Sequence, residues 1–406
     1  MPAENGCIIM TRLTVARTVR IPDPARLALF QRAPEFGPKI LFFSGGSALR
    51  SVSKRIIDYT RNSIHLITPF DSGGSSAKLR EAFQMLAVGD LRNRLMALAD
   101  RSFQGNPEVF ELFAYRFPND LSQVELREWL ARMVAGKEPM IEAIPAPMRR
   151  LVRNHLGYFA DAMPESFDLR GANIGNLILT GGFLNQHRHI DPVIYLFSRL
   201  VNVRGIVRPM ANEYLHLAAE LADGSILVGQ HLITGKEASP LASPVKRLFL
   251  TASRENPVPY KLKLREKIQQ HIATADLICF PIGSFYSSVV ANLLQRGLGN
   301  AVAEVGVPKV YIPNLGADPE QLGMSLGDQV ETLVGYLQRS HTRGDLPPAA
   351  FLSFVLFDGR HHKPAASDLA RIEKLGISAV DLPLVSEESQ GLLDAQRIVE
   401  ALLSMA

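Results

Sequence analysis

The segment at 40–60 constrains the fold of this chain more than any other. Residues 40–43 are apolar without interruption, residues 44–47 read Ser-Gly-Gly-Ser, and an amphipathic stretch follows. An apolar run of this length fits a parallel strand that is covered on both faces. Glycines permit a tight turn, and we expect Ser44 or Ser47 to cap the helix after it. The segment therefore predicts a buried strand, a tight turn and a helix.

The same order of strand, small-residue loop and helix recurs twice further along the chain. A strand at 64–70 leads into Asp-Ser-Gly-Gly-Ser-Ser at 71–76, and a strand at 275–280 leads into a Gly/Ser loop at 283–288. We expect a helix at 289–295 after the third loop. Strands that alternate with helices in this way are typical of βαβ units. The sequence therefore predicts an α/β fold with a doubly wound, mostly parallel sheet.

The patterning also suggests how the chain is divided. Residues 1–38 are mixed in pattern and are assigned to an N-terminal extension, and residues 39–406 to one α/β domain. From about 100 to 167 the chain contains amphipathic helices and no clear strand, which predicts a helical insertion. An Asp-Gly pair at 223–224 predicts a β-hairpin between two short strands.

Composition excludes several classes of protein. The 406 residues are 47% hydrophobic and 21% charged, with 44 Lys and Arg against 40 Asp and Glu. Nucleic-acid binding usually requires a concentrated basic patch, so we expect no nucleic-acid partner. The two cysteines, Cys7 and Cys279, do not make a disulfide framework or a cysteine zinc site, and Cys279 is expected to be an inert core thiol. No run approaches the roughly 18 apolar residues of a membrane span, and no signal peptide is evident. We therefore expect a cytoplasmic protein without a membrane partner.

The three small-residue loops all follow predicted strands. In an open α/β sheet, ligands bind outside the carboxyl ends of the strands, near a reversal of strand order. Small residues let backbone N–H groups approach phosphate oxygens, and the amino terminus of a helix favours an anion. Each loop taken alone is equally consistent with an ordinary βα turn. Three together predict one site for a ligand rich in phosphate.

Two charged residues in these segments are candidates for chemistry. Asp71 follows the second strand and is expected to hold a divalent metal against a diphosphate, or to act as a base; its alternative is to cap the next helix. Arg92 is suited to bidentate phosphate binding, with a solvated or intrahelical salt bridge as its alternative. Asp90 is expected to be the N-cap of the helix that contains Arg92.

Other polar residues carry weaker signals. Asn212 and Glu213 are suited to recognising a sugar or base edge, or to capping a turn. The histidine pairs at 187 and 189 and at 361 and 362 are expected to be structural or exposed, because no third metal ligand accompanies them. A Gly-x-Ser-x-Gly nucleophile motif, a Gly-x-Gly-x-x-Gly dinucleotide fingerprint and a P-loop are all absent. The sequence therefore argues against a serine hydrolase and against a nicotinamide dehydrogenase.

Taken together, the motifs resemble the family of 2-phospho-L-lactate transferase (CofD) and the gluconeogenesis factor (YvcK), from about Lys39 to the carboxyl terminus. They are closest to CofD-related proteins of the YvcK-like branch, and the Phe-Phe-Ser-Gly-Gly opening is similar to CofD-related proteins associated with an ATP-grasp partner. The resemblance rests on the following segments in this order: Gly45-Gly46, residues 71–76, 78–80, 89–93, 175–177, 211–213, 219–224, 283–286 and 292–294.

The resemblance implies a Rossmann-like three-layer α/β/α fold and a nucleoside-diphosphate-linked or nucleotide-sugar ligand. It also implies Mg²⁺, held by Asp71, and transfer of a 2-phospho-L-lactate-type group with release of a nucleoside monophosphate. The alternative is a non-catalytic regulator of the YvcK type that binds a UDP-sugar. Expected protein partners are a second copy of the chain and an ATP-grasp protein. Asp71 is the predicted catalytic residue, and the predicted substrate-binding residues are Gly45, Gly46, Ser47, Gly73, Gly74, Ser75, Ser76, Arg92, Asn93, Asn176, Asn212, Glu213, Gly283 and Ser284.

Two positions depart from the family pattern. The first turn continues as Ser47-Ala48-Leu49, where the family usually has a further glycine, and Ser72 replaces the second of two adjacent acids. Loss of one carboxylate weakens a site for a hard cation, which prefers several oxygen ligands. Both departures argue against phospholactyl transfer, the loss of the second acid favours the regulator alternative, and neither departure opposes diphosphate binding.

Overall fold

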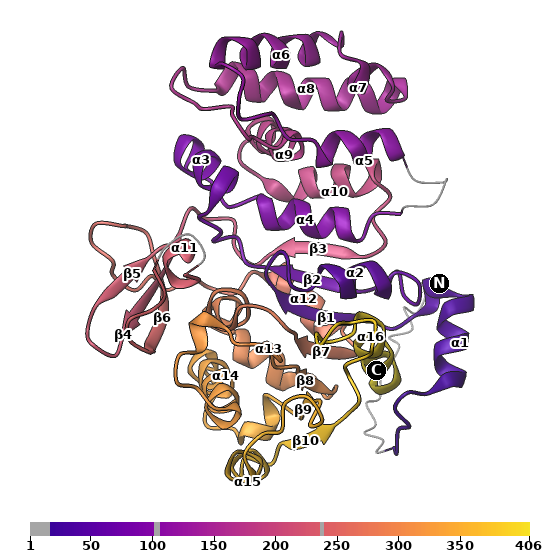
Figure 1. The fold of residues 1–406 in the computed structure, drawn as a ribbon, viewed down its shortest axis with the longest axis vertical. Helices are drawn as coiled ribbons and strands as arrows, with labels where there is room; N and C mark the ends of the chain where they lie inside the picture. Colours follow the sequence, from indigo (N-terminus) through magenta and orange to yellow (C-terminus); the bar gives the residue numbers. More distant parts are fainter. Residues whose placement is uncertain (1–16, 101–105, 236–238) are drawn as a thin grey trace, which may run out of the picture.

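Strand β1, Ile40–Ser44, is buried along its whole length, as its uninterrupted apolar run predicts. A computed structural model of the protein describes residues 17–100, 106–235 and 239–406, so Cys7 lies outside the described residues. β1 pairs in parallel with β2 on one side and with β7 on the other. Ile40 and Phe42 join one hydrophobic core, whereas Leu41 and Phe43 join the other. Helices therefore cover both faces of the sheet, and the predicted three-layer α/β/α fold is confirmed (Figure 1).

The main sheet has seven strands in the order β10-β9-β8-β7-β1-β2-β3, and each adjacent pair is parallel. The chain first proceeds from β1 to β3 in one direction, and later from β7 to β10 in the other. The order therefore reverses between β1 and β7, where a crevice for a ligand is expected. The other strands of this sheet are β2 (Ile64–Ile67), β3 (Ile206–Pro209), β7 (Leu277–Phe280), β8 (Lys309–Tyr311), β9 (Phe354–Phe357) and β10 (Ser378–Asp381).

A second, antiparallel sheet has three strands in the order β5-β4-β6. The hairpin predicted at 223–224 is confirmed: Gly224 adopts φ +89°, and the Asp223 carboxylate accepts a hydrogen bond from the Ser225 amide. The strands are β4 (His216–Leu221), β5 (Ile226–Val228) and β6 (Val245–Thr251). A four-residue helix, α11 (Gln230–Ile233), follows β5 directly.

The helices of the α/β part flank the main sheet. Side-chain caps fix where several of them begin: Asp23, Ser325 and Asp394 each accept hydrogen bonds from first-turn amides. These helices are α1 (Pro24–Arg32), α2 (Arg50–Ile56), α3 (Gly74–Phe83), α4 (Gly89–Ala97), α12 (Glu266–Ala273), α13 (Leu298–Glu304), α14 (Leu326–Ser340), α15 (Ala366–Lys374) and α16 (Ala395–Met405).

A group of helices stands beyond the β3 edge of the sheet, at the top of Figure 1. It includes α9 and α10, which follow the segment predicted as a helical insertion, and α8 packs directly on α9. The helical part of the chain therefore continues to Leu200 before β3 begins. Its members are α5 (Pro107–Ala114), α6 (Gln123–Ala135), α7 (Pro139–Glu142), α8 (Ala146–Ala162), α9 (Ile174–Asn185) and α10 (Ile190–Leu200).

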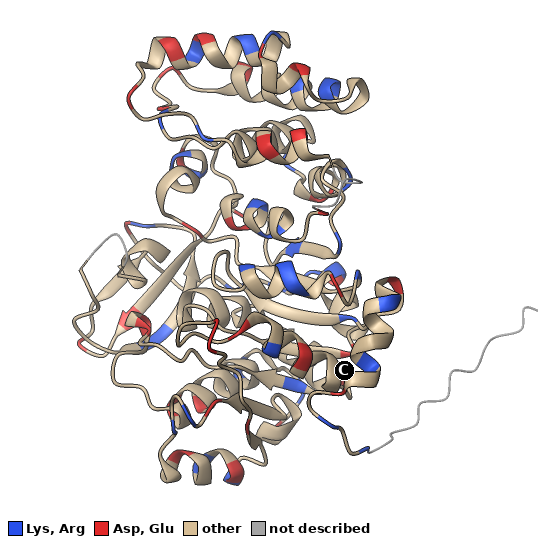
Figure 2. Cartoon of the chain, turned by 45° about the vertical axis from the view of Figure 1, so that its right-hand side comes forward, with Lys and Arg blue, Asp and Glu red and all other residues tan. Residues whose placement is uncertain are grey.

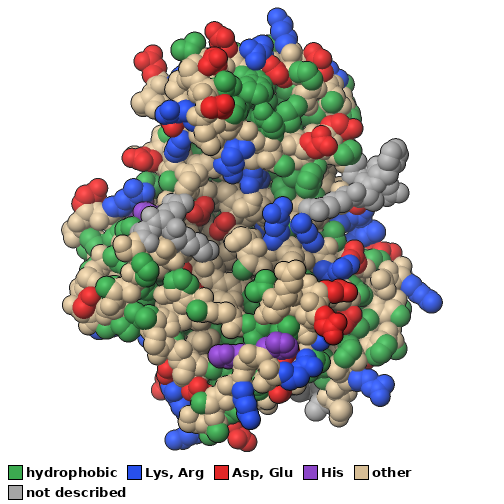
Figure 3. Space-filling view, in the orientation of Figure 1, with side chains coloured by type: hydrophobic (Ala, Val, Ile, Leu, Met, Phe, Trp, Pro, Cys, Tyr) green, Lys and Arg blue, Asp and Glu red, His purple; other side chains and the backbone are tan. Residues whose placement is uncertain are grey.

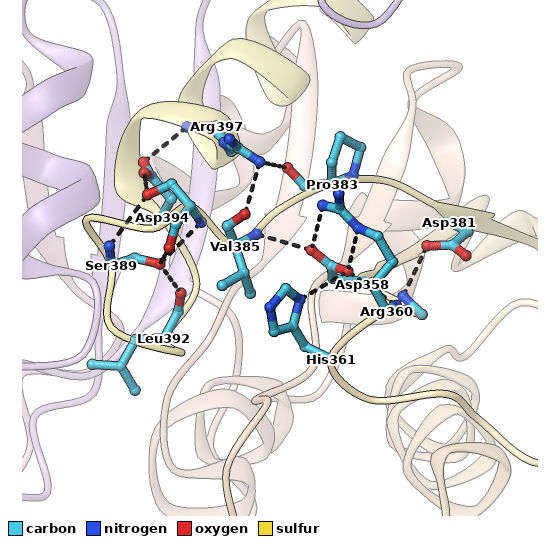
Figure 4. Close-up of polar contacts among 12 residues, drawn as sticks. Asp358, Arg360, His361, Asp381, Pro383, Val385, Ser389, Leu392, Asp394 and Arg397 are labelled. Carbon is cyan, nitrogen blue, oxygen red and sulfur yellow. Dashed lines mark hydrogen bonds and ion pairs between the residues drawn. The ribbon is translucent and has the colours of Figure 1, made fainter.

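Polar contacts centred on Asp358 hold the carboxyl-terminal segment against the end of β9 (Figure 4). The buried Asp358 carboxylate accepts hydrogen bonds from the Val385 amide at 2.9 Å and from the Arg360 amide at 3.1 Å, and it contacts His361 Nδ1 at 3.3 Å. These contacts hold the pKa of Asp358 well below its usual range, although burial opposes them. The side chain of His361 is thus structural, as expected.

Basic and acidic residues are mixed along the described chain. Figure 2 shows basic and acidic residues interspersed along the helices, as their near-equal numbers predict. Among the described residues, no helix combines the length and apolar character needed to cross a bilayer. Cys279 is fully buried in β7, and burial raises the pKa of its thiol, which confirms an inert core cysteine.

Candidate functional site

A pocket opens at the carboxyl ends of β1, β2 and β7, where the strand order reverses. Its cavity volume is about 200 Å³, and the cavity opens to solvent. The three loops that the sequence singles out all contribute to it, together with α4 and α11. Its lining consists of Gly45, Gly46, Ser47, Ala48, Leu49, Asp71, Gly73, Asp90, Gln230, His231, Thr234, Ile282, Gly283, Ser284 and Ser288.

The loop after β1 is held from behind by Arg94 of α4. The guanidinium is fully buried and donates to the carbonyl oxygens of Gly45 at 2.8 Å, Leu49 at 3.0 Å and Gly46 at 3.4 Å. Burial lowers the pKa of Arg94 to about 10, which leaves the side chain cationic at neutral pH. Within the described chain, no protein group accepts a hydrogen bond from the amides of Gly45, Gly46 or Ser47. The turn therefore offers its donors to a ligand.

The serines of this turn do not cap the helix, so that expectation is wrong. Ser44 remains within β1, and its hydroxyl accepts from Arg94 at 3.3 Å. Ser47 is exposed, and α2 begins after Leu49 without a side-chain cap. The turn between β1 and α2 therefore spans residues 45–49, and Arg94 donates to three of its carbonyl oxygens.

The loop after β2 has a similar support in Arg80 of α3. Arg80 is buried and donates to the carbonyl oxygens of Phe70 at 3.1 Å and Asp71 at 3.2 Å, and also to that of Leu215. Burial lowers the pKa of Arg80 to about 10. α3 begins at Gly74, which adopts φ +48°, so the first amides of this helix lie directly after the pocket-lining Gly73. A helix amino terminus carries unpaired N–H groups and positive dipole, and both favour a phosphate.

Two carboxylates reach the pocket, from Asp71 and Asp90. The sequence predicted Asp90 as an N-cap, and this is wrong, because α4 begins at Gly89 and Asp90 lies in its first turn. A Cβ atom at Gly46 would lie 1.9 Å from Asp90 Oδ1, and one at Gly89 would lie 3.3 Å from Asp71 Oδ2. Both glycines thus make room for an acid. Asp71 Oδ1 also accepts from the Gly73 amide at 3.1 Å, but α3 has no side-chain cap, so the alternative role of Asp71 as a helix cap is wrong.

The loop after β7 has its amides occupied by protein. Gly283 donates to Asn314 Oδ1 at 3.0 Å, Phe285 donates to Asp318 at 2.7 Å, and Ser287 donates to Glu320 at 2.8 Å. The helix expected at 289–295 is wrong, because the segment forms a π-helical turn at Phe285–Val289 and a 3₁₀ turn at Val290–Leu293. This loop therefore forms one wall of the pocket through Ser284 and Ser288, and the three amides named above are not available to a ligand.

Four predicted site residues, Ser75, Arg92, Asn93 and Asn176, form a second polar cluster at the amino terminus of α3. Asn176 and Arg116 donate to the Ser75 hydroxyl at 3.3 and 3.4 Å. Arg92 is buried and donates to the Phe113 carbonyl at 3.4 Å and to the Asn93 carboxamide, so the alternative of an exposed salt bridge is wrong.

This cluster retains unused hydrogen-bonding capacity. Asn176 Oδ1 and Arg92 Nε are buried, and neither has a partner among the described residues. Burial, together with the charges of Arg116 and Arg50, lowers the pKa of Arg92 to about 10. Three arginines that repel one another form a favourable place for an anion. Figure 3 shows basic side chains gathered on this face, between the upper helices and the sheet, beside a hollow that contains acidic ones.

The remaining predicted residues lie outside the pocket lining. Gly74 and Ser76 belong to the first turn of α3, and the Ser76 hydroxyl lies 2.3 Å from the position of a Cβ atom at Gly89. Asn212 accepts from Arg265 at 3.1 Å, and the Glu213 carboxylate accepts from the Asn212 amide. His187 and His189 are exposed, as expected.

Two residues that line the pocket, Gln230 and His231, were not predicted. They are brought in by α11, at the end of the antiparallel hairpin. Ser72, noted in the sequence only as a lost acid, hydrogen-bonds to His231 Nδ1 at 2.8 Å. No sequence motif links positions 72 and 231, so their proximity follows from the fold alone.

The two pocket carboxylates, Asp71 and Asp90, suit Mg²⁺ only when a ligand supplies further oxygen atoms. Within the described residues, no group of three or more His, Cys, Asp or Glu side chains is placed to hold a metal ion. Mg²⁺ is commonly held by one or two carboxylates together with substrate phosphates, rather than by an all-protein cage. Asp71 and Asp90 in one pocket fit that arrangement.

Residues 40–390 match the family model described as 2-phospho-L-lactate transferase CofD. The gluconeogenesis factor of Listeria innocua is 28% identical over 381 residues, which cover 91% of this chain and 96% of that protein. The gluconeogenesis factor of Bacillus subtilis is 27% identical, with 90% and 97% covered. A crystal structure of a UPF0052 family member from Bacillus halodurans has a TM-score of 0.65 at 23% identity, covers 90% of this chain and 99% of that one, and shows the same fold.

Proposed function

The chain belongs to the 2-phospho-L-lactate transferase CofD family, and we propose that it binds a nucleoside-diphosphate-linked ligand in the pocket at the β1/β7 reversal and transfers the distal phosphoryl group together with the substituent that it carries. The observation that supports this most directly is the convergence of three features on one pocket. These are the unoccupied amides of the first turn, the amino terminus of α3, and the carboxylates of Asp71 and Asp90.

Each feature has a chemical role in such a transfer. The amides of Gly45 and Gly46 and the first turn of α3 bind phosphate oxygens, and Arg92 lies near the same helix end to offset further negative charge. Asp71 and Asp90 would hold Mg²⁺ against the diphosphate, where the ion would neutralise charge that develops on the phosphate oxygens. Preorganised charge of this kind is the main contribution that a protein makes to phosphoryl transfer.

The proposed transfer is a displacement at phosphorus. An acceptor hydroxyl attacks the phosphorus atom distal to the nucleoside, so that a new P–O bond forms. The anhydride bond between the two phosphorus atoms breaks, and a nucleoside monophosphate leaves with the bridging oxygen. The hydroxyl proton passes to a carboxylate of the pocket.

We expect magnesium-dependent turnover of a radiolabelled nucleoside-diphosphate-linked donor, with a loss of roughly 100-fold or more in Asp71→Ala. Asp58→Ala is the matched control, because Asp58 is half exposed and forms only a surface pair with Arg55. If the protein binds a donor but neither Mg²⁺ nor an acceptor changes it, the transferase proposal fails.

The second candidate is a regulator that binds a UDP-sugar without converting it. Ser72 in place of a second acid favours this role, and the curated relatives described as gluconeogenesis factors support it. A thermal-shift panel of nucleotides and nucleotide sugars, with and without Mg²⁺, separates the two candidates. Stabilisation that is independent of metal and unaccompanied by conversion supports the regulator, and no stabilisation by any nucleotide counts against both.

The setting and partners of this activity remain predictions. We propose a cytoplasmic location from the composition, a homodimer because dimers are common among such enzymes, and an ATP-grasp partner protein from the family resemblance. Size-exclusion chromatography with light scattering tests the homodimer. Co-purification of the tagged chain with an ATP-grasp protein from the same organism tests that partner.

A further inference from the structure

The short helix α11 carries polar side chains from the antiparallel sheet into the pocket. The Gly229 amide donates to the Leu217 carbonyl at 2.8 Å, which fixes the turn from β5 into α11. Gly229 adopts φ +121°, and a Cβ atom there would lie 2.8 Å from His231 Cε1. Glycine is therefore required on both conformational and steric grounds, and the space that it leaves is filled by the imidazole.

The imidazole of His231 is oriented by Ser72. The Ser72 hydroxyl accepts from the His231 amide at 3.2 Å and lies 2.8 Å from His231 Nδ1. With the amide as its donor, the hydroxyl has its own proton to give to Nδ1. In the tautomer that carries its proton on Nε2, Nδ1 accepts from the Ser72 hydroxyl, and Nε2 is a hydrogen-bond donor that Ser72 does not engage. Ser72 is itself 5% exposed, so the pair is held at the wall of the pocket.

Gln230 supplies the complementary group. Its Oε1 atom is buried and lacks a hydrogen-bond partner in the part of the chain that the structure describes, although the residue lines the pocket. A buried acceptor without a partner is costly, and a ligand hydroxyl or N–H group would satisfy it. Both residues of α11 therefore line the same cavity, one with an imidazole and the other with a side-chain oxygen that lacks a partner among the described residues.

We propose that α11 is a ligand-recognition element of this site, in which His231, oriented by Ser72, donates from Nε2 to a phosphate oxygen while Gln230 accepts from a hydroxyl or N–H group of the same ligand. This inference rests on the proposed function, since it concerns the nucleoside diphosphate assigned to the pocket. It gives Ser72 a positioning role at the position where the family pattern has an acid. In this chain, a neutral donor therefore stands beside the diphosphate in place of a second carboxylate.

The test is binding of UDP and GDP, each with Mg²⁺, to the full chain by isothermal titration calorimetry. His231→Ala is expected to weaken binding by about 10- to 100-fold, as for a hydrogen bond to a charged group. His231→Gln, which retains an N–H donor near the Nε2 position, should recover most of that loss. Ser72→Ala should weaken binding less than His231→Ala does. His189→Ala, at an exposed loop position, is the control and should bind as the wild type does.

A second measurement does not depend on the variants folding. In ¹⁵N-histidine spectra of the wild-type protein, the His231 signals should show the Nε2–H tautomer, and the Nε2 signal should move when UDP or GDP is added. Ser72→Ala should mix the two tautomers. A static Nε2 signal under saturating ligand, or unchanged affinity in a folded His231→Ala variant, overturns the role of α11 while the proposed function stands. If the wild-type protein binds neither UDP nor GDP, and no nucleotide or nucleotide sugar of the thermal-shift panel stabilises it, both proposals fail.

Discussion

The loops after β1 and β2 differ sharply from the loop after β7, although all three have the same kind of sequence. In the first two, buried arginines hold the carbonyl oxygens: Arg94 binds those of Gly45 and Gly46, and Arg80 binds those of Phe70 and Asp71. In the third, the side chains that follow β8 hold the amides, through Asn314, Asp318 and Glu320.

The difference shows that composition alone does not make a glycine- and serine-rich loop a phosphate site. What matters is whether neighbouring side chains bind its carbonyl oxygens or its N–H groups. A backbone whose carbonyls are held by a cation directs its N–H groups outward, where an anion can bind them. A backbone whose N–H groups are held by carboxylates has no such donors left. Two of the three loops are thus suited to phosphate, and the third completes the wall of the pocket.

Replacing Arg94 should have the largest effect. Arg94→Met retains most of the side-chain length but leaves the buried carbonyls of Gly45 and Gly46 without the donor that Arg94 supplies. We expect the free energy of unfolding to fall by about 3–5 kcal/mol in urea denaturation, with loss of nucleotide binding. Arg55→Met, at an exposed pair 3.4 Å from Asp58, should change stability by no more than about 0.5 kcal/mol. Equal stability of the two variants would show that Arg94 does not support the turn.

Glu320 allows the third loop to be tested by pH. Burial raises its pKa to about 7, with a further contribution from the charge of Asp318. Because the folded state binds this proton more tightly than the unfolded state, the stabilisation is complete below the unfolded pKa, near 4.5, and is lost as pH rises through about 7. The wild type should lose on the order of 3 kcal/mol of unfolding free energy from this group over that window.

Glu320→Gln should flatten the dependence of stability on pH between about 4.5 and 7, because the amide does not titrate. Urea denaturation at several pH values measures this. Glu304→Gln is the control, since Glu304 is half exposed in a surface pair with Arg343. If the wild type and Glu320→Gln have the same slope, the carboxyl group is not the titrating support of the loop.

Gly46→Ala should have the smallest effect on the free energy of unfolding but should weaken magnesium-dependent nucleotide binding. The new methyl group would displace Asp90 Oδ1, from which it would lie 1.9 Å away. We expect a stability loss of about 1 kcal/mol, because a short side chain can turn aside, and at least a tenfold loss of magnesium-dependent nucleotide binding. Gly306→Ala, which meets no atom within 4 Å, is the control. Retained binding in Gly46→Ala would remove Asp90 from the site.

Much of the fold was predictable because it depends on local patterns. The apolar run at β1, the Asp-Gly turn between β4 and β5, and the amphipathic period of α16 each specify their element within a few residues. The element that was wrong lies at 285–293. Its amides bind acids that follow another strand, and no local pattern in the segment reports those acids.

The candidate site was predictable only in part. Gly45, Gly46, Asp71 and Gly283 carry a local signal, since small or acidic residues directly after a buried strand point to the ligand edge of the sheet. Asp90 was given a capping role, because the sequence alone does not show that Gly46 leaves room for its carboxylate. Gln230 and His231 follow a hairpin in a different sheet, so neither carries such a signal.

By itself, the sequence determined that this chain forms a parallel α/β sheet with small-residue loops at the ends of β1, β2 and β7, because period and composition act within one segment. Only the tertiary structure decided which loops keep their amides for a ligand and which residues meet there. Those outcomes depend on Arg80, Arg94 and Glu320 being buried against backbone from distant segments, and on α11 placing His231 beside Ser72. Contacts between such separated residues are set by how the layers pack, which no single stretch of the chain encodes.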